Sequence, residues 1–168
     1  MAGITSGAYI GQTGRAMRVV EFSVTLDNAA CAIGDLVADA LQVTGLTSSP
    51  YSTMRIVRAQ VFEVSASAIE ADLDFWFSNA EFLTASNAAL DLSADPTSVL
   101  GKFSVVAADY VALAGGGCSM ADKEDVNLDL VPVLNDTRFW LQIVNADSGA
   151  ITFDSAATLF IRLWVSLD

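Results

Sequence analysis

Apolar and polar residues alternate with a period of two along much of this 168-residue chain. In the segment VEFSVTLD, at positions 20–27, the apolar residues Val20, Phe22, Val24 and Leu26 alternate with polar or charged ones. Successive side chains of a β-strand point to opposite faces, so this alternation gives one apolar and one polar face. The segment is therefore predicted to be a strand with one face in the core.

The same pattern recurs in EADLDFWF, DVNLDLVPV and RFWLQIVNA, whose inward-facing sets are Ala71, Leu73, Phe75 and Phe77, then Val126, Leu128 and Leu130, then Phe139, Leu141 and Ile143. Further strands are expected in MRIVRAQVFEV, GKFSVV, GDLVADALQV, AITF and the closing ATLFIRLWVSLD, with turn-forming segments between them. Many strands at short intervals with almost no helix predict an all-β fold. We expect an antiparallel jelly-roll-like β-sandwich of about eight strands, formed as one domain by residues 18–168.

Two segments differ from this pattern. We expect one or two short helical turns in the chain. One is predicted in SADPTSVLG, because Asp95 can cap the turn, Pro96 suits its first helical position and Gly101 can end it. Residues 1–17 are expected to form an extended N-terminal arm with the apolar residues Ile4, Tyr9 and Ile10. The arm is either a frayed terminus or a segment that becomes ordered on a neighbouring subunit.

Four aromatic residues lie on strand faces opposite the core sets: Trp76, Trp140, Phe160 and Trp164. A single exposed aromatic residue is ordinary, but several on outer faces indicate a covered or binding surface. Either the long segments 78–100 and 107–125 cover them, or another subunit does. Aromatic residues around an arginine, here Arg162, are typical of interface cores. The predicted interface residues are Ile4, Tyr9, Ile10, Trp76, Trp140, Phe160, Arg162 and Trp164.

Charge and hydropathy narrow the possible partners. The chain carries 8 basic and 20 acidic residues, a net charge of −12, and 53% of its residues are hydrophobic. Nucleic-acid binding requires clustered Lys and Arg, and the eight here are scattered, so no nucleic-acid partner is expected. The longest stretch without charge, residues 40–54, is too short and too polar to span a membrane. The N-terminus does not resemble a secretory signal, so we expect a soluble protein made in the cytoplasm.

The residues that usually carry chemistry are scarce. The sequence has no histidine, which removes the commonest general base and metal ligand. Glu70, Asp72 and Asp74 could supply the carboxylate pair of a glycoside hydrolase, although their alternate spacing is also that of any solvated strand face. Cys31 and Cys118 have no disulfide or metal-site spacing and are expected to be reduced.

A calcium site is the remaining metal hypothesis. Asp122, Glu124 and Asp125 are expected in a loop, where clustered carboxylates could bind Ca²⁺. The stretch lacks the regular spacing of a twelve-residue calcium loop, so a charged loop without metal is the alternative. The prediction from the residues is no enzyme activity, no catalytic residue, no cofactor and no metal site.

Three segments resemble small structural proteins of tailed bacteriophages: CAIGDLVADAL at 31–41, DLDFWFSNAEFLTASNAALDLSADPTSVLGKFSVV at 72–106, and SAATLFIRLWVSLD at 155–168. The likeness extends over most of residues 30–168. Two positions depart from the family pattern. Ser86 stands where an acidic residue is usual, and CAI at 31–33 stands where an aromatic and small residues are usual.

The resemblance implies a function without catalysis. The better understood relatives are capsid cement or decoration proteins with jelly-roll-like sandwiches, commonly trimeric on the outer shell. The chain would then be a virion protein of the capsid surface, made in the bacterial host cytoplasm, with the major capsid protein and itself, as a homotrimer, for partners. The alternatives are a tail or fibre component, a glycan-binding module that stacks sugars on Trp76 or Trp140, or a glycan-cleaving enzyme.

Overall fold

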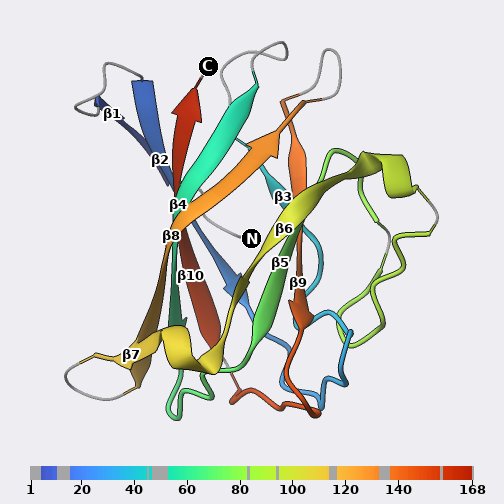
Figure 1. The fold of residues 1–168 in the computed structure, drawn as a ribbon. Helices are drawn as coiled ribbons and strands as arrows, with labels where there is room; N and C mark the ends of the chain where they lie inside the picture. Colours follow the sequence, from blue (N-terminus) through green and yellow to red (C-terminus); the bar gives the residue numbers. More distant parts are fainter. Residues whose placement is uncertain are drawn as a thin grey trace.

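The computed structural model describes residues 5–10, 16–44, 46, 53–82, 84–93, 95–113, 117–132, 137–155 and 157–167, and their strands form two antiparallel sheets. The six-stranded sheet has the order β1-β2-β10-β4-β8-β7, with β1 at Thr5–Ile10, β2 at Ala16–Thr25, β4 at Met54–Val64, β7 at Tyr110–Ala112, β8 at Cys118–Leu130 and β10 at Thr158–Leu167. The four-stranded sheet has the order β3-β9-β5-β6, with β3 at Leu41–Val43, β5 at Leu73–Ser78, β6 at Val99–Val105 and β9 at Phe139–Asn145. The two sheets face each other as layers (Figure 1).

The strand order is that of a jelly roll. Without the short strand β7 and the N-terminal strand β1, eight strands remain. In chain order, the first, eighth, third and sixth form one sheet, and the second, seventh, fourth and fifth form the other. This is the eight-stranded arrangement of two interleaved Greek keys. The predicted jelly-roll-like antiparallel sandwich is confirmed.

The core fills the space between the sheets and uses the predicted inward-facing residues. Val20, Phe22 and Leu26 are buried, and Val24 packs against the core from a partly buried position. The rings of Phe75 and Phe103 stack with centroids 4.7 Å apart and planes 3° apart. Burying such large apolar side chains is the main favourable contribution to folding.

Some predicted strand boundaries are wrong. The segment AITF makes only an isolated bridge between Ile151 and Cys31, and within GDLVADALQV only β3 is a strand. Strand β8 starts at Cys118, so residues 118–125 belong to a paired strand, and 110–112 form β7 beside it. Residues 110–112 and 118–125 are thus part of the six-stranded sheet and its edge, and the prediction that they cover an outer face is wrong.

The helical prediction is partly correct. Pro96–Ser98 form a 3-10 turn, η1, and Asp95 accepts hydrogen bonds from the hydroxyls of Thr97 and Ser98. A second 3-10 turn, η2, covers Ala107–Asp109. Gly101 does not end the first turn, because β6 begins at Val99 and contains Gly101. In the part of the chain that the structure describes, no helix is long enough to cross a membrane.

Candidate interaction surface

The outward-facing side chains of the six-stranded sheet form rows that cross its strands. Residues directly opposite each other in antiparallel strands share a face. One row runs from Ser23 on β2 through Phe160 on β10, Phe62 on β4 and Met120 on β8 to Val111 on β7. Four consecutive members of this row are apolar, although they lie on the face away from the core.

This apolar row is open to solvent. Of its members, Phe160 is 47% exposed and Val111 61%, and Val64, two residues after Phe62 on β4, is 38% exposed. These are three of the seven exposed large hydrophobic residues among those that the structure describes. Phe160 also lines an open groove of about 500 Å³ together with Phe62. A groove with apolar walls on a strand face is a candidate binding surface.

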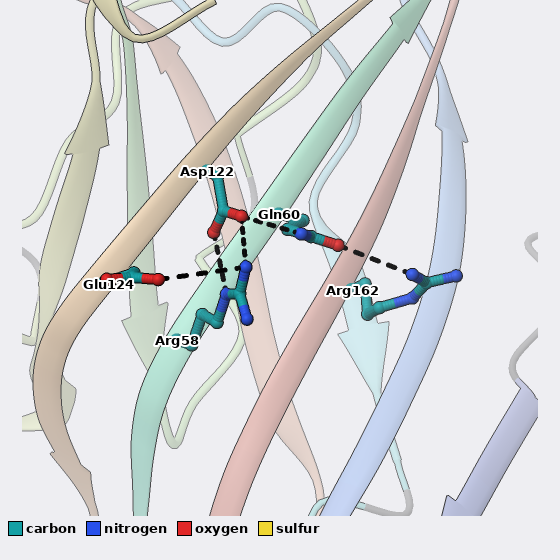
Figure 2. Close-up of polar contacts among 5 residues, drawn as sticks. All are labelled: Arg58, Gln60, Asp122, Glu124 and Arg162. Atoms are coloured by element: carbon teal, nitrogen blue, oxygen red, sulfur yellow. Dashed lines mark hydrogen bonds and ion pairs between the residues drawn. The ribbon is translucent and has the colours of Figure 1, made fainter.

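The next row along the same face is polar and fully paired across the strands. Arg162 on β10 forms an ion pair with Glu21 on β2 and donates a 3.4 Å hydrogen bond to the Oε1 of Gln60 on β4. The Nε2 of Gln60 donates a 2.8 Å hydrogen bond to Asp122 on β8. Figure 2 shows this chain of contacts from Arg162 to Asp122. The row therefore links four adjacent strands.

Arg58 extends the polar row to an aromatic ring. Its guanidinium donates two hydrogen bonds to Asp122, one of them from Nε at 2.8 Å, and lies 4.0 Å from a carboxylate oxygen of Glu124 (Figure 2). Its Cζ lies 4.9 Å from the ring centroid of Trp164, and the Cζ of Arg162 lies 5.8 Å from the same ring. Such cation–π contacts fix the half-buried indole in place.

The ionisation of this group follows from its contacts. The hydrogen bonds from Arg58 hold the pKa of Asp122 below its ordinary value, against the opposing effect of partial burial. The bonds to Asp122 correspondingly raise the pKa of Arg58. Both groups are therefore charged throughout the physiological range.

The charges on this face nearly cancel. Near one end of the sheet, Arg55 donates bonds of 2.6 and 3.1 Å to the two carboxylate oxygens of Asp129. Together with the residues above, strand register and contacts place three arginines and four acids on this face: Arg55, Arg58 and Arg162 against Glu21, Asp122, Glu124 and Asp129. Their sum is −1, whereas the whole chain carries −12.

The outer face of the four-stranded sheet is different because the chain itself covers part of it. Ser78 and Gln142 point outward beside Trp140 and Trp76, yet they are 1% and 0% exposed. Ser78 donates a 2.7 Å hydrogen bond to the carbonyl of Ala80, at the start of the segment that connects β5 to η1. In Figure 1 this segment lies beside the four-stranded sheet. The expected intramolecular cover thus exists here, within 78–100.

The aromatic residues predicted for an interface fall into two groups. Trp76 and Trp140 are half-buried on the four-stranded sheet, with the ammonium nitrogen of Lys102 5.0 Å from the ring centroid of Trp76. Phe160 and Trp164 lie with Arg162 on the outer face of the six-stranded sheet.

The arm residues give less information. Tyr9 and Ile10 lie in β1, where they are the register partners of Met17 and Ala16 of the same chain. Ile4 lies outside the described residues. The predicted role of these three residues in an interface stays a prediction.

The acidic residues proposed for chemistry have structural contacts. Asp74 pairs with Lys102 and accepts a hydrogen bond from Ser104, and Asp72 accepts the backbone N–H of Ala107 at 2.6 Å. Glu70 has a φ of 56° and precedes β5, so it does not continue the strand face as the alternation predicted. The geometry does not single out any two of these residues as an acid and a nucleophile.

The proposed calcium loop is a strand. Asp122, Glu124 and Asp125 lie in β8, and Asp122 is engaged by Arg58. The described ranges contain no group of three or more acidic or cysteine side chains that could hold a metal ion.

Both cysteines are free. Cys31 lies in the core, and burial, with a smaller effect from Asp35 and Asp27, raises the pKa of its thiol to about 11. Cys118 is half-buried and lines the groove beside Phe160. Cys31 is therefore an inert core residue, whereas Cys118 belongs to the open face.

Sequence reasoning missed three members of the apolar row: Phe62, Met120 and Val111. Phe62 carried the same signal as Phe160, an aromatic residue out of phase with the core residues Val61 and Ala59. Met120 and Val111 lie in the stretch read as a loop, so their place on the face follows only from the register of β8 with β4 and β7.

Comparison with known proteins does not assign this chain to a family. No known protein family matches the sequence, and no curated protein matches it. Among solved structures, the chain is similar to one of Desmodium yellow mottle tymovirus, with 14% identity over 99% of this chain and 87% of that one and a TM-score of 0.28. It is also similar to one of Mud crab tombus-like virus, with 11% identity over 99% and 89% and a TM-score of 0.35. At these scores the likenesses support no conclusion about this chain, and its fold rests on its own strand order.

Proposed function

We propose that this chain is a structural protein of a virus particle, and that it decorates the outer shell of a tailed-bacteriophage head. Jelly rolls are used by viral shell proteins, lectins and cupins. The sequence has no histidine, so the usual cupin metal ligands are absent. The resemblance of residues 31–41, 72–106 and 155–168 to phage structural proteins favours the first of these uses.

The observation that carries the proposal is the outer face of the six-stranded sheet. It combines exposed apolar side chains, centred on Phe160, with arginines whose charges are already paired across strands. Aromatic and arginine side chains held rigidly in a nearly neutral surface suit adhesion, because little side-chain entropy is lost on binding. Such a surface requires no reactive group.

The proposed mechanism is multivalent contact. A homotrimer at a local threefold axis of the head engages several major capsid subunits at once, and effective concentration makes modest contacts hold together. Ile4, together with Tyr9 and Ile10 on the edge strand β1, contacts a neighbouring subunit, and the acidic surface pairs with basic loops of the shell. The protein is made in the host cytoplasm and is then located on the capsid surface.

Binding to heads tests this proposal. Expanded heads are prepared from the phage that encodes this protein, in a form that lacks the protein. Purified protein is mixed with these heads, and the heads are sedimented. The bound copies should saturate at a fixed number per head that matches the symmetry of the shell. Absence from the pellet, or uptake that rises without saturation, would contradict decoration.

The glycan-binding alternative has less support from the geometry. Sugar stacking requires an open aromatic face, and Lys102 already lies against the ring of Trp76. The glycan-cleaving alternative is weaker still, since Asp74 and Asp72 are engaged in structural contacts.

A further inference from the structure

The apolar row on the six-stranded sheet is exposed at its centre as well as at its edge. Strands β10 and β4 are the two middle strands of the sheet, and Phe160 and Phe62 lie opposite each other on them. Phe160 is 47% exposed although it lies on a middle strand, where neighbouring side chains flank it on both sides. With Val64 and Val111, it forms an apolar patch of the kind that marks a protein contact.

The charge distribution indicates which partner fits this patch. A chain with a net charge of −12 repels its own copies over most of its surface. The seven charged side chains on this face sum to −1, and the arginines Arg58 and Arg162 are paired within the chain. Two copies that approach each other through this face therefore repel each other much less than copies that approach through the rest of the acidic surface.

We propose that this face packs against further copies of the chain, around a symmetry axis that passes over Phe160. A residue on such an axis meets its own copies, so a charged residue there would face like charge, whereas phenylalanine packs against itself. Arg162 and Trp164 then lie beside the contact. The inference rests on the proposed oligomer and assigns it an interface.

Disulfide trapping tests the position of the axis. Phe160→Cys is made with Cys118→Ser, because Cys118 lines the same groove and could pair with the new thiol. Oxidation should convert most of the Phe160→Cys protein to covalent dimers. Val131→Cys in the same background is the control, since Val131 is 50% exposed but follows the far end of β8. Equal dimer yields from both variants would overturn the inference.

Native mass gives an independent readout. The chain has a mass of 17.7 kDa, and the wild type is expected to sediment at two or more times that value. Phe160→Asp should sediment as the monomer with an unchanged far-ultraviolet circular dichroism spectrum, while Val131→Asp keeps the wild-type mass. A monomeric wild type, or a Phe160→Asp variant of wild-type mass, would refute self-association through this face.

Failure of this inference can be distinguished from failure of the decoration role. If the wild type saturates heads while Phe160→Asp keeps the wild-type mass, decoration stands and the interface is wrong. If Phe160→Asp becomes monomeric but the wild type never binds heads, the interface stands and decoration is wrong. A monomeric wild type that loses head binding on Phe160→Asp would assign the face to the shell instead of to a second copy.

Discussion

Arg58 contacts an acid and an aromatic ring at once, and this double contact explains much about the outer face. Its guanidinium holds Asp122 on the neighbouring strand and lies against Trp164 on the other side. A planar guanidinium can do both, because its edge donates hydrogen bonds while its face stacks. Trp164 is therefore held in one orientation before any partner arrives.

Asp122→Asn should lower the free energy of unfolding by about 1 kcal/mol at neutral pH, because it removes a charged, partly buried partner of Arg58. The pKa of Asp122 is depressed in the folded protein, so its stabilisation is present above the ordinary value of 3.8. It is lost as the pH falls through the lower, folded-state pKa. Urea unfolding of both proteins across this range measures the difference.

The control for this prediction is Glu124→Gln, because Glu124 lies at 4.0 Å from Arg58 and its side chain is 77% exposed. That substitution should change stability by a few tenths of a kcal/mol at most. A loss for Asp122→Asn that persists undiminished in strong acid would show that the ion pair is not its cause.

At the scale of elements, strands in which apolar and polar residues alternate strictly could be predicted from the sequence. Strands that form only because a neighbouring strand pairs with them could not. β2, β5 and β9 have clear inward sets and form as predicted. The first half of β8 reads as a charged loop, and it is a strand only because β4 pairs with it on both sides of a bulge. The aromatic residues of the outer face could be predicted, but the row they form depends on register, which bulges shift.

Gly101→Ala should destabilise the fold by about 1–3 kcal/mol. Gly101 has a φ of +145°, a conformation that other residues rarely adopt, and an added Cβ would lie 2.6 Å from the Cδ1 of Leu128. Leu128 packs against the core from β8, so its movement would disturb the contact between the two sheets. Thermal unfolding measures the loss.

Gly149→Ala is the matched control for Gly101→Ala. An added Cβ at Gly149 would meet no atom within 4 Å, so the melting temperature should change little. If the two variants melt together, the close approach of β6 to β8 is not the reason for the glycine.

At the scale of the whole molecule, one chain presents two unlike outer faces. The four-stranded sheet is partly covered by the segment after β5, whereas the six-stranded sheet offers an apolar row and a balanced set of charges. Most of the charge of −12 therefore lies elsewhere on the molecule, where it keeps free copies apart and remains available to a basic partner. The proposed decoration of the head by multivalent contact requires both an adhesive face and a remaining surface that keeps free copies apart.

The temperature at which the phage head bursts tests the proposed stabilisation of the head most directly. Heads that lack the protein are heated with the wild type, with Phe160→Asp or with Val131→Asp, and DNA release is followed. Wild type and Val131→Asp should raise the bursting temperature, since a ligand at a hundred times its dissociation constant stabilises by about 2.7 kcal/mol per site. Monomeric Phe160→Asp should raise it much less. An unchanged bursting temperature with saturating wild type would contradict the account.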